Sequence, residues 1–473
     1  MLQRRTLLAA TAVAAVGASA VLSAASAGSK PIAFNAPVKL TIEKNFGGYE
    51  PSITVDRFNN IYVTAHKQNH GLALSPDSRA ATQARSQSWL WWSSDGKTFK
   101  DTPGLTPLQE QNAEFGDEGD LARDDTGHIY FVDTTVTDNS FSRYASTGNG
   151  KLTLEATRPI GPFGEPVDDR PWIAAHGDKV VLYIGNEGDK ATYPNPTSGE
   201  SQGNGAGPGR YTAYMSTNGG DTFDPIGIQL KDSGWCRPAA DHAKGSKTFY
   251  VLCTNDGGAN DVNENAGEAP YDKGTIWSYV TTDDGKHWSR YKVGGYNAKD
   301  PWSTYPSVTV AKDGTVYALF NDHPDASACT SPVEQQALGC DGHIKSSELS
   351  LWTSKDKGRH WTKKVITKQG IIRYTWLDVA PDGTLGIAYY YRPDKKTDWY
   401  VYAATAKPGQ AFHPVNAAPK LKLASKSYSS AFGDFFQIAF GPDSKLNIAV
   451  TVQNNDIANF EGLNTDIYYI RQK

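Results

Sequence analysis

A short unit of two strands repeats along the chain, and this repetition constrains the fold more than any other sequence feature. Each copy is a short or alternating apolar run, a turn of Gly, Asp or Asn, and a second run of β-branched or aromatic residues. This order is typical of a β-hairpin. Seven copies follow one another at roughly 51 to 70 residues, a spacing near that of propeller repeats. They are Pro51–Asp56 with Ile61–Val63, Asp120–Ala122 with Ile129–Phe131, Pro171–Ala174 with Val181–Tyr183, Pro238–Ala240 with Phe249–Val251, Pro306–Val310 with Asp313–Ala318, Trp376–Val379 with Asp382–Leu385, and Phe436–Ala439 with Asp443–Leu446.

Further short strands between the copies predict four strands in each unit. One such sheet cannot bury both of its faces, whereas several sheets stacked around an axis bury them against one another. We therefore predict an all-β fold, a β-propeller of four-stranded antiparallel blades, with seven blades and six as the alternative. We expect one domain over residues 28–473, closed by pairing of Lys39–Glu43 with Asp466–Ile470. The third strands predicted on this basis include Ser88–Trp92, Thr212–Met215, Ile276–Val280 and Leu349–Trp352.

The first 27 residues have the pattern of a removable export signal. Arg4 and Arg5 precede an Ala-rich apolar run, Leu7–Leu22, and small residues follow at Ala25–Ala27. The arginine pair fits the twin-arginine route and the general secretory route alike. We expect a secreted or periplasmic protein with no other membrane-spanning segment.

The charge balance excludes one large class of partners. Lys and Arg total 47 against 51 Asp and Glu, so the net charge is -4 and there is no basic excess to hold phosphates. We expect no nucleic acid partner, and we expect the chain to be a monomer.

Four cysteines in an exported chain are expected to form disulfides. Cys236 and Cys253 flank one strand pair, and Cys329 and Cys340 flank one polar loop, so we predict two local bridges. A zinc site is the rival interpretation, but the chain has no CxxC pair and no His at ligand spacing to them.

A second repeated motif lies where each third strand ends. The segments from Thr281 to Trp288 and from Ser354 to Trp361 match the Asp-box pattern, [ST]-x-D-x-G-x-x-[WF]. A third copy, from Ser216 to Phe223, carries Asn in place of Asp, and a fourth, from Ser93 to Phe99, is one residue short. The segment Thr405–Phe412 is a degenerate copy. The polar side chains can bond the turn backbone while the aromatic covers it, so we expect a structural role for Asp95, Asn218, Asp283 and Asp356.

These motifs resemble the sialidase superfamily of Asp-box propellers over nearly the whole mature chain. The resemblance implies the fold more than the activity. Sialidases open their first blade with a Phe-Arg-Ile-Pro segment that supplies an arginine for the substrate carboxylate. Gly48–Pro51 stands there in this chain, so that arginine is absent and sialidase activity does not transfer directly.

The strand order predicts where chemistry occurs. If the Asp boxes lie on one face, first strands begin and second strands end on the opposite face, around the axial channel. Arginines can bind a carboxylate and aromatic rings can stack on sugars, so we expect an acidic oligo- or polysaccharide there. A structural alternative is that Asp169, Arg170 and Arg237 only bridge adjacent blades. The expected substrate-binding residues are Asp117, Asp169, Arg170, Arg237, Arg373, Trp376 and Asp434, and the catalytic candidates are Glu50, His66, Glu118 and Tyr305.

Three functions use this face differently. The first is a sialidase-like glycoside hydrolase that cleaves beside a sialic or uronic acid, with two carboxylates, or with a Tyr nucleophile backed by Glu, drawn from these candidates. The second is a polysaccharide lyase with His66 as base and Arg170 or Arg237 neutralising the carboxylate. The third is a propeller that binds glycan or protein without catalysis.

No cofactor is required by these schemes, and calcium is the metal for which the sequence offers clustered oxygen ligands. Asp and Asn are frequent in Asn255–Asn265 and in Asp322–Asp325, although neither has EF-hand spacing.

Overall fold

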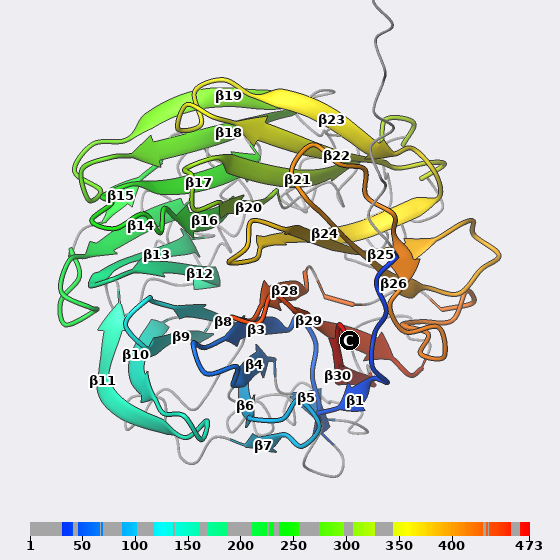
Figure 1. Ribbon diagram of the computed structural model, residues 1–473, viewed down its shortest axis with the longest axis horizontal. Coiled ribbons are helices and arrows are strands. Elements are labelled where there is room, and N and C mark those ends of the chain that lie inside the picture. Colours follow the sequence, from blue (N-terminus) through cyan, green and yellow to red (C-terminus); the bar gives the residue numbers. More distant parts are fainter. Residues whose placement is uncertain are drawn as a thin grey trace, which may run out of the picture.

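Seven four-stranded antiparallel sheets form a ring, so the predicted seven-bladed β-propeller is confirmed. The computed structural model describes residues 31–40, 46–66, 68–69, 88–101, 118–135, 138–160, 168–186, 211–224, 227–230, 236–254, 274–297, 306–326, 344–428, 432–433, 435–455 and 464–473. These residues contain no helix. The first strand of each blade lies nearest the centre, and each contacts the first strands of its two neighbours (Figure 1).

The first four blades follow the chain in order, each beginning with its innermost strand. Blade one is β3 (Ser52–Val55), β4 (Ile61–Ala65), β6 (Trp89–Ser93) and β7 (Lys100–Asp101). Blade two is β8 (Glu118–Arg123), β9 (His128–Thr135), β10 (Asp138–Ser146) and β11 (Leu152–Ile160). Blade three is β12 (Asp168–His176), β13 (Lys179–Asn186), β14 (Tyr211–Ser216) and β15 (Ile228–Gln229). Blade four is β16 (Cys236–Ala240), β17 (Phe249–Thr254), β18 (Gly274–Thr281) and β19 (Ser289–Tyr296).

The last three blades repeat this order, and a strand from the other end of the chain completes the seventh. Blade five is β20 (Ser307–Val310), β21 (Val316–Asp322), β22 (Glu348–Ser354) and β23 (Thr362–Thr367). Blade six is β24 (Ile371–Val379), β25 (Leu385–Arg392), β26 (Tyr400–Ala406) and β27 (Val415–Asn416). Blade seven is β28 (Gln437–Phe440), β29 (Leu446–Gln453), β30 (Thr465–Arg471) and β1 (Val38–Lys39), and a separate pair joins β2 (Phe46–Gly47) to β5 (Gln68–Asn69).

The N-terminal strand closes the ring on the C-terminal one, as predicted. Val38 pairs with Tyr469 and Lys39 with Tyr468, so the blue β1 lies beside the red β30 in Figure 1. The rest of the predicted closing segment, residues 41–45, is outside the described residues, and so are residues 1–27 of the expected export signal.

The apolar core lies between the blades rather than within them. Each of the seven contacts between neighbouring blades contains its own cluster of buried side chains. Between blades seven and one, for example, Tyr469 packs with Trp91 and Ile53, all at most 3% exposed. A single blade would leave these side chains in water, which explains why the ring must form as one unit.

The turns after β6, β14, β18 and β22, which carry the Asp-box pattern or a variant of it, share one set of hydrogen bonds. In the turn after β22, the Ser354 hydroxyl donates to Asp356 Oδ1 over 2.9 Å and accepts from the Gly358 amide over 2.9 Å. Asp356 Oδ1 also accepts from the His360 amide over 3.0 Å. Equivalent bonds form around Asp95, Asn218 and Asp283.

These turns also pack against the blade that precedes their own. A Cβ atom at Gly358 would come within 2.7 Å of Ser278 in blade four, and one at Gly220 would overlap Phe141 in blade two. Phe223, the aromatic residue of the same turn, packs edge-on against Phe141 at 5.0 Å. The structure therefore gives these turns a role in stacking the blades.

Candidate functional site

Contacts between turns show which of them lie on the same face of the ring. Asp284, in the turn after β18, donates its amide to the carbonyl of Lys247 in the turn between β16 and β17 over 3.1 Å. Gly219 donates in the same way to Asp178 over 2.6 Å. The Asp-box turns therefore share a face with the first turns, and first strands begin on the other face, as the strand order predicted.

Two of the predicted catalytic residues meet on that other face. Glu50 precedes β3 and His66 follows β4, so the hairpin of these two strands brings them together. His66 Nε2 lies 2.9 Å from Glu50 Oε2, and each residue is only 5% exposed. A carboxylate and an imidazole are both groups that can accept or donate a proton in catalysis.

Glu50 is held in a backbone conformation that a glutamate rarely adopts. Its φ is 54°, in the left-handed region, and its amide donates to the Thr451 hydroxyl of blade seven over 3.2 Å. A Cβ atom at Gly433 would overlap the Glu50 side chain, so only glycine fits beside it. Strained residues fixed by their surroundings are often found at functional sites.

An aromatic ring covers the imidazole of this pair. Tyr49 stacks on His66 with ring centroids 4.1 Å apart, and its carbonyl accepts from the His66 amide over 3.1 Å. A Cβ atom at Gly48 would come within 2.5 Å of the His66 carbonyl. The segment from Gly48 to Glu50 therefore fixes the position of His66 through both its backbone and its ring.

Arg237 lies in a cage of aromatic rings from three other blades. Its guanidinium carbon is 2.9 Å from the ring centroid of Trp172, 4.6 Å from that of Trp376 and 4.7 Å from that of Phe435. The residue is 2% exposed, whereas Trp376 is half-buried. The contact with Trp172 of the adjacent blade three is the kind that the blade-bridging alternative expects, whereas Trp376 and Phe435 belong to blades six and seven. The predicted contact of Arg237 with substrate stays a prediction.

Two further buried arginines lie beside the ring of Trp399. Arg373 in β24 is 0% exposed and Arg392 in β25 is 4% exposed, with guanidinium carbons 5.7 Å and 4.5 Å from the Trp399 ring. The neighbouring Tyr374 has a φ of 43° at an irregularity between β24 and β25. The contact of Arg373 with substrate also stays a prediction.

A second histidine occupies the position in blade five that His66 has in blade one. His323 follows β21, is fully buried, and has Nε2 2.8 Å from the Ile372 carbonyl. It is therefore bonded to backbone of the next blade, in contrast to the carboxylate contact of His66.

Several predicted residues cannot be placed. Tyr305, Asp117 and Asp434 lie outside the described residues, and the side chains of Glu118, Asp169 and Arg170 are not described, although their backbones belong to β8 and β12. The catalytic or binding roles of these residues remain predictions.

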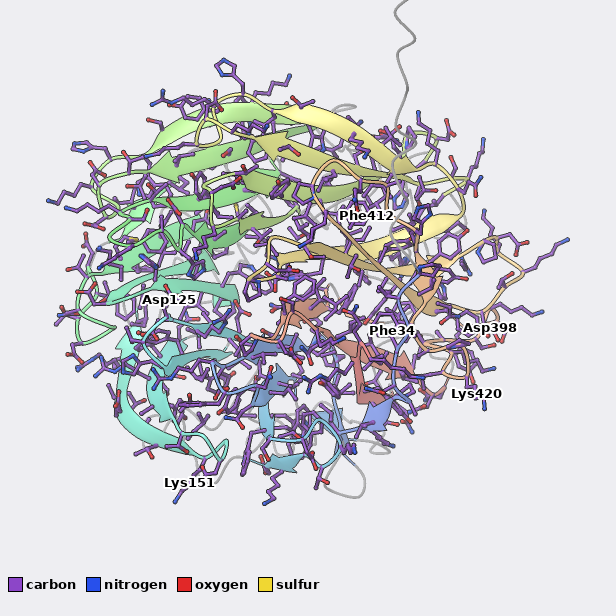
Figure 2. The ribbon with its side chains drawn as sticks, viewed as in Figure 1. Phe34, Asp125, Lys151, Asp398, Phe412 and Lys420 are labelled. Atoms are coloured by element: carbon purple, nitrogen blue, oxygen red, sulfur yellow. A yellow bond between two sulfur atoms is a disulfide. The ribbon has the colours of Figure 1, made fainter. Side chains whose placement is uncertain are left out.

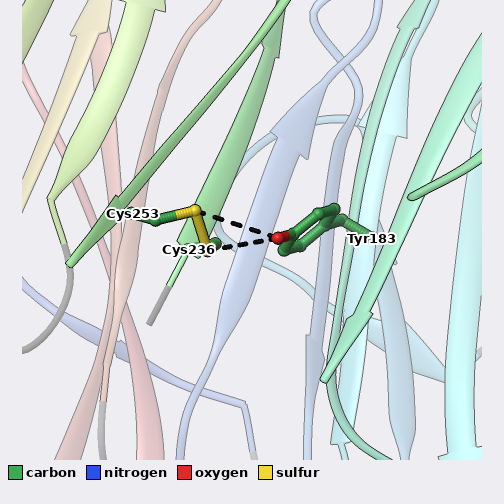
Figure 3. Close-up of a disulfide and its surroundings, with 3 residues drawn as sticks. All are labelled: Tyr183, Cys236 and Cys253. Atoms are coloured by element: carbon green, nitrogen blue, oxygen red, sulfur yellow. Dashed lines mark hydrogen bonds between the residues drawn. A yellow bond between two sulfur atoms is a disulfide. The ribbon is translucent and has the colours of Figure 1, made fainter. Parts of the chain in front are cut away.

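One of the two predicted disulfides is confirmed. Cys236 and Cys253 are bonded across the β16–β17 pair, where they lie opposite each other. The Tyr183 hydroxyl of blade three lies 3.4 Å from Cys236 Sγ and 3.8 Å from Cys253 Sγ (Figure 3). The bridge fixes the start of β16 and with it the neighbouring Arg237. Cys329 and Cys340 are outside the described part of the chain.

The acidic residues considered for calcium have protein partners. Asp322 Oδ1 accepts from the Asn297 amide over 2.9 Å, and Asp325 Oδ2 accepts from the Ser346 hydroxyl over 3.1 Å. Burial raises the pKa of Asp322, which disfavours its charged form. Residues 255–265 fall in a part that the structure does not describe.

Two residues that hold the Glu50–His66 pair were not predicted from the sequence. Thr451 and Gly433 come from blade seven, and 401 residues separate Thr451 from Glu50. The only signal that could have found them is the expectation that blade seven adjoins blade one.

The described strands form a seven-bladed β-propeller. Comparison with known proteins does not assign the chain to a family. No protein-family model matches the chain, and no curated protein matches it. Among the described residues, none forms a helix with the length and apolar character needed to cross a bilayer.

Solved structures resemble the chain only distantly. A protein of unknown function from Dyadobacter fermentans has a TM-score of 0.49 and 11% identity, over 94% of this chain and 100% of that chain. An α-L-arabinanase from Penicillium chrysogenum has a TM-score of 0.41 and 10% identity, over 92% and 98%. The NanB sialidase from Streptococcus pneumoniae has a TM-score of 0.43 and 11% identity, over 93% and 70%. Similarities this low carry no argument about substrate or reaction.

Proposed function

We propose that this chain is an exported carbohydrate-active enzyme that cleaves a glycosidic bond beside an acidic sugar. The observation that carries the proposal is the contact between Glu50 and His66, which joins a carboxylate to an imidazole on the face opposite the Asp-box turns. The strained φ of Glu50 and the ring of Tyr49 stacked on His66 support a dedicated role for this pair. The chain is proposed as a distant member of the Asp-box propellers because its four turns share one bonding pattern.

Hydrolysis is the first form of this activity. It adds water across the glycosidic bond and needs a proton donor for the leaving oxygen together with a second carboxylate. Glu50 is the proton donor or base in this scheme, and His66 contacts its carboxylate. Glu118, Asp117 or Asp434 supplies the second carboxylate.

Elimination is the second candidate, and the Glu50–His66 contact favours it specifically. His66 removes the proton on the carbon next to the uronate carboxylate. The electron pair then forms a carbon–carbon double bond and the glycosidic oxygen leaves with its bonding electrons, taking up a proton. Glu50 stabilises the imidazolium that His66 becomes.

The test uses purified mature protein and a panel of sialylated and uronate-containing glycans. Elimination gives an unsaturated uronate that absorbs in the ultraviolet, whereas hydrolysis gives a new reducing end without that absorbance. His66→Gln and Glu50→Gln are each expected to lower turnover by about 10²- to 10⁴-fold. His323→Gln is the matched control, because His323 has the same place in another blade but faces a backbone carbonyl.

The proposal fails if wild-type protein releases no product from the whole panel, and a propeller that only binds glycan or protein then becomes the better description. It also fails if both variants keep wild-type turnover. Thermal unfolding of each variant separates loss of chemistry from loss of fold.

A further inference from the structure

A cluster of two histidines and one aspartate lies on the face that carries the Asp-box turns. Asp125 is in the turn between β8 and β9, His176 is the last residue of β12, and His242 follows β16. One possible ligand atom from each lies within 4.8 Å of the other two. Asp125 is labelled in Figure 2. The proposed chemistry of Glu50 and His66 uses none of these side chains.

The three residues come from equivalent places in three consecutive blades. Each lies where a first strand ends, and β12 contacts both β8 and β16. The stacking of blades two, three and four therefore sets the spacing of the cluster. His176 is buried, whereas the side chains of Asp125 and His242 are 47% and 43% exposed, so solvent and ions reach the cluster from one side.

The distances fit a small coordination sphere. Asp125 Oδ2 lies 2.8 Å from His176 Nδ1 and 3.4 Å from His242 Nδ1. Ligand atoms in a tetrahedral zinc site are about 3.3 Å apart, given metal–ligand distances of about 2.0 to 2.1 Å. The centroids of the two imidazole rings are 5.6 Å apart and the rings are perpendicular.

The donor set suits a metal cation. Asp125 offers a carboxylate oxygen, and His176 and His242 each offer an imidazole nitrogen. These are two of the ligand types that zinc takes in proteins. Arg123 and His242 both interact electrostatically with the buried Asp378 of blade six, so a cationic side chain also lies near the cluster.

We propose that Asp125, His176 and His242 bind one divalent transition-metal ion of the zinc class, which joins blades two, three and four. Imidazole nitrogens select zinc and similar ions, whereas calcium takes oxygen ligands. With three protein ligands, the fourth position faces solvent and takes a water molecule. On this face the ion stabilises the ring and takes no part in the chemistry proposed for Glu50 and His66.

The test titrates the untagged, metal-free protein with two metals. Calorimetry monitors the titration with Zn²⁺, and visible absorption monitors the titration with Co²⁺. Wild-type protein is expected to bind one ion per chain and to give the intense bands of four-coordinate Co²⁺. His242→Ala and Asp125→Asn are expected to weaken Zn²⁺ binding at least about tenfold. Zn²⁺ should raise the Tm of the wild-type protein but not that of His242→Ala.

His287→Ala is the matched control, because His287 lies 2.6 Å from Asp283 in an exposed pair and is not part of the cluster. This variant should bind Zn²⁺ as the wild-type protein does. Equal affinity in wild type and His242→Ala overturns the proposal, and so does a wild-type protein that binds no Zn²⁺. His242 is exposed, so its replacement is expected to leave the fold intact, and circular dichroism checks this.

Discussion

Gln437 donates a hydrogen bond from Nε2 to Asp120 Oδ1 over 2.8 Å, and this bond joins the first strands of blades seven and two across that of blade one. Ser52 of blade one donates to the same oxygen over 2.6 Å. The amide of Ile173 in blade three donates to Asp120 Oδ2 over 3.0 Å. One buried carboxyl group therefore connects four of the seven blades near the centre of the ring.

Replacing this carboxyl should destabilise the whole ring. Asp120→Ala leaves two buried donors, Gln437 Nε2 and the Ile173 amide, without this acceptor, whereas the Ser52 hydroxyl can still donate to Gln437 Oε1. Each orphaned donor costs about 1 to 3 kcal/mol. We expect the free energy of unfolding to fall by at least about 2 kcal/mol in urea titrations. Lys420→Ala, at an exposed residue, is the control and should change nothing measurable. Equal stability of Asp120→Ala and the control would show that the network contributes little.

Arg237→Ala should lower the Tm by several degrees. The substitution empties a cage formed by three rings, and large-to-small changes at buried sites cost about 2 to 5 kcal/mol. Arg237→Lys should also destabilise, because a lysine does not stack on rings as the planar guanidinium does. Calorimetric scans measure both effects. An unchanged Tm with lost glycan cleavage would instead place Arg237 at the substrate.

The Asp-box carboxylates should make the protein less stable in acid. Contacts with the side chain and amide of His287 lower the pKa of Asp283 to about 2, and equivalent contacts with His360 lower that of Asp356 further. A lowered pKa in the folded state gives stability that is complete above the unfolded value of about 3.9 and is lost as the pH falls through the folded value.

Asp283→Asn should therefore flatten the dependence of the unfolding midpoint on pH between about 4 and 2. Urea titrations of wild type and variant at pH 5 and pH 2.5 measure this difference. Glycan cleavage at neutral pH should be unaffected, because the turn is on the face opposite Glu50. A variant that keeps the full pH dependence of the wild type contradicts the assignment.

Removing the Cys236–Cys253 bridge should destabilise the fold by about 3 kcal/mol, the value for a closed loop of this size. The double variant Cys236→Ala with Cys253→Ala tests this in urea without disturbing other cysteines. A reductant should lower the urea midpoint of the wild-type protein but should not lower that of the double variant in the same way. No difference between the two proteins would mean that the strand pair alone fixes this region.

Much of the fold could be predicted because the described residues in the first two strands of the blades are mostly buried. β4 and β29, for example, are buried at every position, and such runs are visible as apolar segments before and after a turn. The outermost strands could not be predicted in this way. β7 has two exposed residues, so no periodic pattern distinguishes it from a loop.

The candidate site was less accessible to sequence reasoning. Glu50 and His66 were both expected on one face, but only the pairing of β3 with β4 brings their side chains into contact. The burial of Arg237 could not be read from the sequence either, because the rings around it come from blades three, six and seven. The cluster of Asp125, His176 and His242 becomes visible only when the ends of the first strands are aligned blade by blade.

The pairing of Val38 with Tyr469 has a consequence for how the protein is made. Joining residues so distant in sequence carries a large entropic penalty, and the contact cannot exist until β30 has left the ribosome. Until then the growing polypeptide is an open arc whose first blade leaves apolar side chains such as Trp91 and Ile53 without the neighbouring blade that buries them. We expect this short-lived species to be the one most prone to aggregate with its own copies.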